Sequence, residues 1–324
     1  MTRLIPRSAA DVPDTRPLTA AEFQGLAQVP PEVEWFANIR NSRTRRAYEI
    51  DLADFSAFVG VRAPTEFRGV TRAHIIAWRN ALEGRALAAA TIRRKLSALS
   101  SLFDALCEAN AVTHNPVNGV RRPKEGANEG KTPALGDHQV RALLAAPDAT
   151  TLKGKRDRAV LTTFLFHGLR CAELAALSTR DLQERRGVKH LQVLGKGDRV
   201  RYVPAHPAAL QRISEYVEAA GHGHEAGPLF RPVKNPAGKT LEKSLTQSSI
   251  YRHIVCHYAA RAGIDVEGFC THALRATAAT NARDNDADIA KVQEWLGHAS
   301  IATTRLYDRR TTRPEDSPTF KVAY

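Results

Sequence analysis

The chain has 324 residues, long enough for two domains that each bury a core of their own. It carries 47 Lys and Arg against 34 Asp and Glu, a net charge of +13 with a pI near 9.9, which predicts a polyanionic partner. Apolar runs of about 18 residues are absent, and the N-terminal stretch lacks the apolar core of a signal peptide. A membrane partner is therefore disfavoured, and we expect a cytoplasmic, nucleoid-associated protein that binds nucleic acid.

The four cysteines are spaced too irregularly for a C-x-x-C pair, so we expect reduced thiols. They are Cys107, Cys171, Cys256 and Cys270. Several His and Cys residues lie near one another in sequence, but they lack the paired short spacings of a structural zinc site. These are His253, Cys256, His257, Cys270 and His272. We predict no metal site.

The first 30 residues have no sustained apolar period and are expected to form a flexible arm. Helical periodicity begins at Val33, and Ser42 is a candidate cap for a helix through Phe58. A second helix follows Thr71 to about Gly84, and a third starts near Ala88. The third helix has an apolar stripe at regular helical spacing, made of Ile92, Leu96, Leu99, Phe103 and Leu106. Asn115-Pro116 is predicted to break it.

Basic residues beside these helices suit contacts with phosphates. They are Arg43, Arg45, Arg46, Arg93, Arg94, Lys95, Arg121 and Arg122. The segment 120–132 has Gly, Pro and charge but no apolar period, which is typical of a linker. We therefore predict an arm over 1–30, a helical DNA-binding domain over 31–122, a linker over 123–132 and a second domain over 133–324.

The second domain is predicted to be mixed α/β and mostly helical. Helices are expected from Asp137, over 156–167 up to Gly168, from Cys171, over 207–220 and over 247–262. Between them, alternating apolar residues on both sides of Gly195-Lys196-Gly197-Asp198 indicate a β-hairpin that carries Lys196 in its turn. The chain is thus predicted to be mainly α, with one small β-sheet.

The segment 271–308 combines residue types that suit phosphoryl transfer. His272 and Arg275 share one helix face, and Leu296-Gly297-His298 ends the following helix at a glycine. Ser300 is a candidate cap for a short helix carrying Tyr307, nine positions beyond His298. Cationic side chains neutralise phosphate oxygens, and a phenol can attack phosphorus to form a covalent intermediate.

Several motifs occur in a fixed order after the basic helical domain: Leu169-Arg170 with Glu173, Lys196 in a hairpin turn, H-x-x-R, L-G-H and Tyr307. Together with the T-x-x-x-Y-x-x-D-L-x-x-F pattern over 44–55, this order resembles the tyrosine recombinase, or phage integrase, family. The resemblance covers roughly residues 33–309. It implies a SAM-like, core-binding helical domain followed by a catalytic domain.

The resemblance also implies roles for the matched residues. Arg170 and Arg275 would bind the non-bridging oxygens of the scissile phosphate, and Lys196 would protonate the departing 5′ oxygen. His272 would act in proton transfer, His298 would donate a hydrogen bond to the phosphate, and Tyr307 would form a 3′-phosphotyrosine. Glu173 would support the site, and no cofactor is implied. His167 and Ala276 depart from residues common in the family without removing a catalytic group.

The implied partner is double-stranded DNA with an inverted-repeat core site, bound by a homotetramer that joins two duplexes through a Holliday junction. An accessory DNA-bending protein or a second recombinase are further possible partners. Integration, excision, cointegrate resolution and dimer resolution all stay open. Two alternatives are a type IB topoisomerase-like enzyme, which would act as a monomer, and a non-catalytic DNA-binding protein.

Overall fold

The computed structural model describes residues 24–26, 28–124, 132–195, 199–234 and 239–298, together with residues 19 and 304. Its internal contacts divide the chain into two compact units, Met1–Ala127 and Asn128–Tyr324, called here the N-terminal unit and the C-terminal unit. Most of the predicted arm and of the predicted linker lie outside the described residues.

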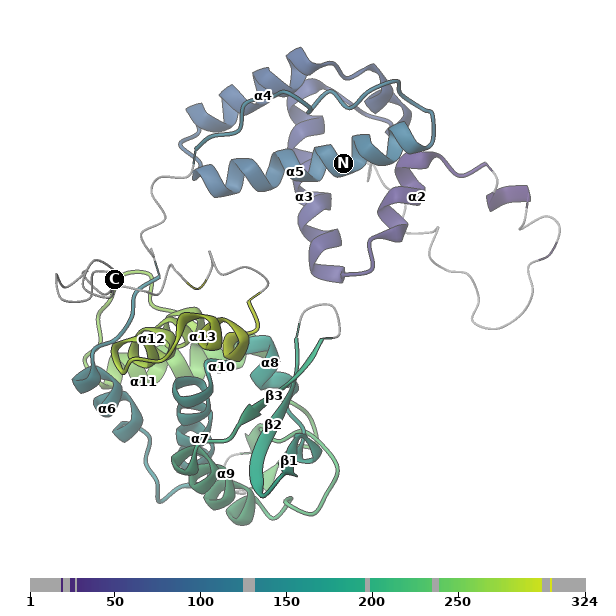
Figure 1. Ribbon diagram of the computed structural model, residues 1–324. Coiled ribbons are helices and arrows are strands. Elements are labelled where there is room, and N and C mark those ends of the chain that lie inside the picture. The colour runs from purple at the N-terminus through teal and green to yellow at the C-terminus, as the bar shows by residue number, and fades with distance from the viewer. Residues whose placement is uncertain are drawn as a thin grey trace, which may run out of the picture. The chain divides into compact units, whose positions relative to one another are not determined.

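The described part of the N-terminal unit is helical. Its elements are α2 Pro31–Asn38, α3 Ser42–Val59, the 3-10 helix η2 Pro64–Gly69, α4 Arg72–Gly84 and α5 Ala89–Glu108. The long helix α5 packs against α2, α3 and α4 (Figure 1). Its predicted apolar stripe is buried along its whole length, from Ile92 to Leu106, which confirms the period read from the sequence.

Two helix ends differ from the predictions. Asn41, and not Ser42, caps α3: its side-chain oxygen accepts the N–H groups of Arg43 and Thr44 at 3.0 and 3.2 Å. Helix α5 ends at Glu108, well before Asn115-Pro116. Asn115 is instead buried, and its amide nitrogen donates to the Asp104 carboxylate at 2.7 Å. The Asn-Pro pair therefore fixes the returning segment and does not terminate the helix.

A buried ion cluster joins α3 to α5. Asp51 is fully buried and accepts hydrogen bonds from the Arg94 guanidinium. Lys95, only 6% exposed, lies with its Nζ 3.2 Å from Asp51 Oδ1 and 2.7 Å from Asp54 Oδ2. Asp51 and Lys95 are buried, and because buried charges need partners, their pairing contributes to the stability of the unit, while the Arg94 side chain is 45% exposed.

The C-terminal unit combines helices with a three-stranded and a two-stranded sheet. In chain order its described elements are α6 Asp137–Ala145, α7 Leu152–His167, α8 Cys171–Ala176, η3 Thr179–Asp181, β1 Leu182–Arg185, β2 Val188–Leu194, β3 Val200–Pro204, α9 Pro207–Ala220, β4 Val233–Lys234, β5 Lys239–Thr240, α10 Gln247–Ile250, the π-helical η4 Tyr251–Cys256, α11 His257–Arg261, α12 Thr271–Asp284 and α13 Ile289–Leu296.

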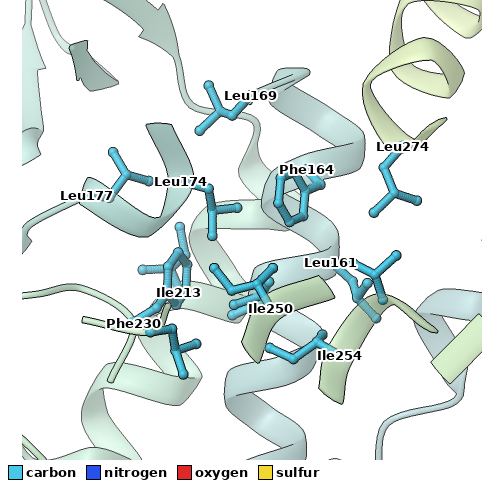
Figure 2. Close-up of a cluster of buried hydrophobic side chains, with 14 of the residues drawn as sticks. Leu161, Phe164, Leu169, Leu174, Leu177, Ile213, Phe230, Ile250, Ile254 and Leu274 are labelled. Atoms are coloured by element: carbon cyan, nitrogen blue, oxygen red, sulfur yellow. The ribbon is translucent and has the colours of Figure 1, made fainter. Parts of the chain in front are cut away.

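The core of this unit lies around α7 (Figure 1). Figure 2 shows Leu161 and Phe164 of α7 surrounded by apolar side chains from several other helices. These include Leu174 of α8, Ile213 of α9, Ile250 of α10, Ile254 of η4 and Leu274 of α12. The continuous apolar run in the sequence of α7 is explained by this central position, because most residues of the helix are buried and none is fully exposed.

The predicted hairpin is present, and the sheet has one strand more than expected. β2 pairs with β3 in antiparallel register, with Leu194 opposite Val200, and Gly195 N–H donates to Arg199 O at 2.8 Å at the hairpin's end. β1 pairs with the other edge of β2. The mainly helical fold with a small antiparallel sheet is therefore confirmed, while β1 was missed because its four residues, LQER, show little apolar alternation.

Other boundaries moved by a few residues. Helix α7 begins at Leu152 and not Arg156, because Thr151 caps it by accepting the Gly154 N–H at 3.0 Å. The helix predicted over 247–262 is continuous in chain order but changes geometry, with a π-helical turn over Tyr251–Cys256 between α10 and α11.

His167 ends α7 in a fully buried position. Its Nδ1 lies 3.1 Å from Thr163 O, and its Nε2 accepts the His206 N–H at 3.0 Å. Burial lowers the pKa of His167 to about 4, so the ring is neutral near pH 7. The neutral ring satisfies both contacts, whereas a protonated Nε2 would lose its acceptor role.

Acidification should therefore destabilise the C-terminal unit. The unfolded chain takes up a proton on His167 near the ordinary histidine pKa, while the folded chain does not. The free energy of unfolding should therefore fall by about 1.4 kcal/mol between neutrality and about pH 5.5. Urea unfolding, followed on α7 peptides by hydrogen exchange and mass spectrometry, measures this loss. His167→Gln should show a flatter pH dependence; an unchanged dependence would contradict the assignment.

Candidate active site

Arg170 and Glu173 are placed by the sharp transition from α7 to α8. Gly168 ends α7 with φ +56°, and a Cβ there would lie 2.7 Å from Leu296 Cδ2, so the turn requires glycine. Arg170 then occupies the N-cap position of α8. Its backbone N–H donates to Glu173 Oε2 at 2.8 Å, and its guanidinium donates to Glu173 Oε1 at 2.7 Å.

A second arginine, Arg201 of β3, binds the same carboxylate. Its two terminal nitrogens donate to Oε1 and Oε2 of Glu173 at 2.9 and 2.7 Å. Burial alone would raise the pKa of Glu173, but the hydrogen bonds from Arg201 and from the Arg170 backbone lower it to about 2. Glu173 is therefore ionised throughout the physiological range and holds two cations together.

Sequence reasoning missed Arg201, although a signal was available. β3 pairs Arg201 with Val193 and Val203 with Leu191, and these three apolar partners are buried on the inner face of the sheet. Arg201 thus stands at a position where the alternation of the strand calls for an apolar residue. A charged residue at an inward-facing position indicates a partner inside the protein.

Arg275 lies on α12 and is fully buried. One terminal nitrogen donates to Gly168 O at 2.6 Å and the other donates to Leu296 O at 2.7 Å. Arg170 donates to the adjacent carbonyl, Gly297 O, at 3.2 Å. The two predicted arginines are therefore brought together at the L-G-H turn that ends α13, which also places His298 beside them.

The two predicted histidines are neutral near pH 7. Burial lowers the pKa of His272, and the charges of Arg275 and Arg170 lower it further. Burial and the same two arginines lower the pKa of His298 to about 4. His298 Nδ1 lies 2.9 Å from Thr304 Oγ1, a fully buried hydroxyl that sequence reasoning also missed. A neutral imidazole can accept a proton or donate one hydrogen bond, according to its tautomer.

Two predicted catalytic residues, Lys196 and Tyr307, lie outside the described residues, as does the predicted cap Ser300. Within the described ranges, no group of three or more His, Cys, Asp and Glu side chains is arranged to hold a metal ion. The four cysteines all lie in these ranges, and none of them takes part in a disulfide. In the same ranges, no helix is both long enough and apolar enough to cross a bilayer.

The predicted DNA-binding residues of the N-terminal unit fall into two groups. Arg43, Arg46, Arg121 and Arg122 are exposed. Others hold the unit together: Arg45 donates to the Ile39 and Ala37 carbonyls, Arg93 to the Pro123 carbonyl, and Arg94 binds Asp51. Lys95 is buried in the ion cluster with Asp51 and Asp54, so its ammonium group is occupied inside the unit and does not face a phosphate.

Glu173→Gln should destabilise the C-terminal unit by about 2–4 kcal/mol, because it leaves Arg170 and Arg201 without the buried anion between them. The calorimetric transition of this unit measures the loss. Glu184→Gln is the matched control, since Glu184 pairs with Lys189 on the surface and should change stability by at most about 1 kcal/mol. Equal effects of the two variants would contradict the role of Glu173.

Comparison with known proteins identifies the family of the chain. Residues 134–313 match the phage integrase family, and residues 37–110 match the phage integrase N-terminal SAM-like domain. The chain is 33% identical to tyrosine recombinase XerC of Pelobacter propionicus, over 82% of this chain and 83% of that protein. It is 30% identical to tyrosine recombinase XerD of Listeria monocytogenes, over 84% of this chain and 89% of that protein.

Solved structures share the fold at lower identity. The XerH recombinase bound to palindromic difH substrate, in a post-cleavage complex, has a TM-score of 0.65 and 22% identity, covering 84% of this chain and 77% of that one. A lambda integrase tetramer bound to a Holliday junction has a TM-score of 0.65 and 18% identity, covering 89% and 78%. With the family model spanning the catalytic motifs, the chain belongs to the phage integrase family of tyrosine recombinases.

Proposed function

We propose that this recombinase cleaves and rejoins DNA at specific sites through a 3′-phosphotyrosine on Tyr307. The observation that carries the proposal is the convergence of Arg170 and Arg275 on the L-G-H turn, with neutral His298 beside them. Three segments distant in sequence meet there. The resulting concentration of positive charge is suited to a phosphate that gains negative charge during the reaction.

The two arginines would stabilise the charge of the phosphate in different ways. The Arg170 side chain is 37% exposed, so its guanidinium is within reach of a phosphate at the surface of the unit. Arg275 is fully buried and fixed by two carbonyls, so it acts as a permanent charge under the site. Arginine suits both positions because its charge persists at any physiological pH and its geometry is planar.

Neutral histidines suit the proton transfers of this reaction. A phenol has a pKa near 10, so Tyr307 needs an acceptor for its proton, and we assign that role to His272. His298 would donate through Nε2 to the phosphate, which requires the Thr304 hydroxyl to donate to its Nδ1. Because burial and the nearby arginines hold both rings neutral, the acceptor is available near pH 7.

Lys196 would protonate the 5′ oxygen that leaves as Tyr307 binds phosphorus. Support comes from the hairpin. The backbone N–H of Gly195, which precedes Lys196, donates a hydrogen bond to Arg199 O. Arg201 of the same hairpin binds Glu173, which also binds Arg170. The tyrosyl ester conserves the energy of the broken bond, so rejoining needs no ATP. Since arginines and a lysine supply the charge and the proton, we propose that no cofactor takes part.

We further propose that a homotetramer acts on two duplexes through a Holliday junction, at core sites with inverted repeats. Support comes from the similarity to the XerH complex with palindromic difH and to the lambda integrase tetramer on a Holliday junction. The N-terminal unit would bind the core site and the C-terminal unit would carry the chemistry, in the cytoplasm at the nucleoid. Integration, excision and the resolution of cointegrates or dimers all use this chemistry.

Exposed and buried cations of the N-terminal unit should behave differently on substitution. Arg46→Ala and Arg121→Ala should each weaken DNA binding and reduce the slope of log affinity against log salt by about one. Lys95→Met should instead destabilise the unit by about 3–5 kcal/mol, because Asp51 and Asp54 lose a buried partner. Titration of labelled DNA at several salt concentrations, with thermal unfolding of each variant, separates the two effects. A stably folded Lys95→Met with a smaller salt slope would contradict the assignment.

The covalent chemistry can be tested directly on DNA from the source organism. Sheared genomic DNA is incubated with the full chain, with and without EDTA, the mixture is denatured, and protein-linked DNA is captured and sequenced. Wild type should yield adducts that share one junction sequence, and Tyr307→Phe should yield none. Persistence of adducts in Tyr307→Phe, or their loss on chelation in wild type, would refute the proposal.

A further inference from the structure

Arg201 occupies a position where three parts of the C-terminal unit meet. Its side chain is 16% exposed and binds both oxygens of Glu173, which also holds Arg170. Its guanidinium also lies close to two glycines. A Cβ built on Gly195 would be 3.5 Å from Arg201 Nη1, and a Cβ built on Gly297 would be 3.2 Å from the same atom. Arg201 therefore contacts the base of the hairpin, α8 and the L-G-H turn together.

This arrangement fixes the hairpin more strongly than strand pairing alone. A bidentate arginine–carboxylate pair sets both distance and orientation, and here it joins β3 to α8. Gly297 has φ +65° and approaches the Arg201 side chain, so no larger residue could replace it without displacing that side chain. β3, the strand that follows Lys196 in the hairpin, is thereby held in a defined place relative to Arg170.

We propose that Arg201 is a positioning residue for the general acid: it fixes the hairpin base so that Lys196, next after Gly195, reaches the leaving oxygen. The inference rests on the proposed function, because it presupposes cleavage by Tyr307 with Lys196 as the acid. Lysine cannot replace Arg201, since a single ammonium group cannot form the bidentate pair with Glu173.

The chemistry of the step provides a selective test. In cleavage, the Tyr307 oxygen bonds to phosphorus and its proton passes to His272, while the bond from phosphorus to the 5′ oxygen breaks and Lys196 gives that oxygen a proton. If sulfur replaces the bridging 5′ oxygen, a thiolate leaves without needing a proton. A defect in the acid, or in its position, then disappears, whereas a defect in phosphate binding or in folding persists.

The experiment compares two nicked suicide duplexes that carry the site captured in the adduct experiment, one with a 5′-bridging oxygen and one with a 5′-bridging sulfur. Single-turnover cleavage is measured for wild type, Lys196→Ala, Arg201→Ala and Arg201→Lys. Arg185→Ala is the matched control, because Arg185 belongs to the same sheet but is exposed and lies over the Tyr202 ring. DNA binding is measured in parallel.

On the oxygen substrate, Lys196→Ala should lose about 10²-fold or more in rate, Arg201→Ala about tenfold or more, and Arg201→Lys should also be impaired. On the sulfur substrate, all three should come within about threefold of wild type, and Arg185→Ala should match wild type on both substrates. Rescue by sulfur also shows that each rescued variant is folded and binds DNA.

Other outcomes overturn the inference in distinguishable ways. If Arg201→Ala and Arg201→Lys stay impaired on the sulfur substrate while Lys196→Ala is rescued, Arg201 does not act through the acid. If Arg201→Lys cleaves the oxygen substrate like wild type, the bidentate contact is not required. If sulfur fails to rescue Lys196→Ala, or wild type forms no tyrosyl adduct, the proposed function itself fails and this inference with it.

Discussion

The site depends on one buried carboxylate. Glu173 is about 4% exposed in its side chain, yet it stays ionised because Arg201 and Arg170 donate hydrogen bonds to both of its oxygens. Guanidinium groups gathered in one site repel one another, and an anion between two of them offsets that repulsion. Glu173 therefore allows Arg170, Arg201 and Arg275 to accumulate in the same region before any DNA is bound.

Backbone carbonyls complete the arrangement. Arg275 and Arg170 donate to the successive carbonyls of Leu296 and Gly297, so the turn that presents His298 is held by the two arginines to which we assign charge stabilisation. The same two arginines also affect the protonation of the histidines. Burial and the neighbouring arginines lower the pKa values of His272 and His298, which keeps both rings neutral near pH 7. A preorganised site of this kind has little left to reorganise when the reaction begins.

Much of the fold could be predicted from the sequence, because its strongest signals are local. The apolar stripe from Ile92 to Leu106 predicted a buried helix, and the alternation around Gly195 predicted the hairpin; both are present. Predictions failed where tertiary contacts decide. Asn41 and not Ser42 caps α3. Both residue types are good caps, so the sequence alone does not decide which of them lies at the N-cap position. Lys95 looked like a surface cation beside Arg94, but the carboxylates of α3 draw it into the interior.

The candidate site shows the same division. Arg170, His272, Arg275 and His298 were found because they lie in short motifs, whereas Arg201 and Thr304 stand outside any motif and become visible only through their contacts. Spacing along the chain says nothing about a salt bridge between β3 and α8. A basic residue at an inward strand position was the remaining clue.

The most direct measurement is the identity of the residue that becomes linked to DNA. The covalent complex formed by the full chain can be digested with nuclease and protease and sequenced by tandem mass spectrometry. We expect a peptide in which Tyr307 carries a 3′-linked nucleotide phosphate. A nucleotide on Tyr251, Tyr258 or any other residue would contradict the assignment of the nucleophile and, with it, the arrangement of the site around the L-G-H turn.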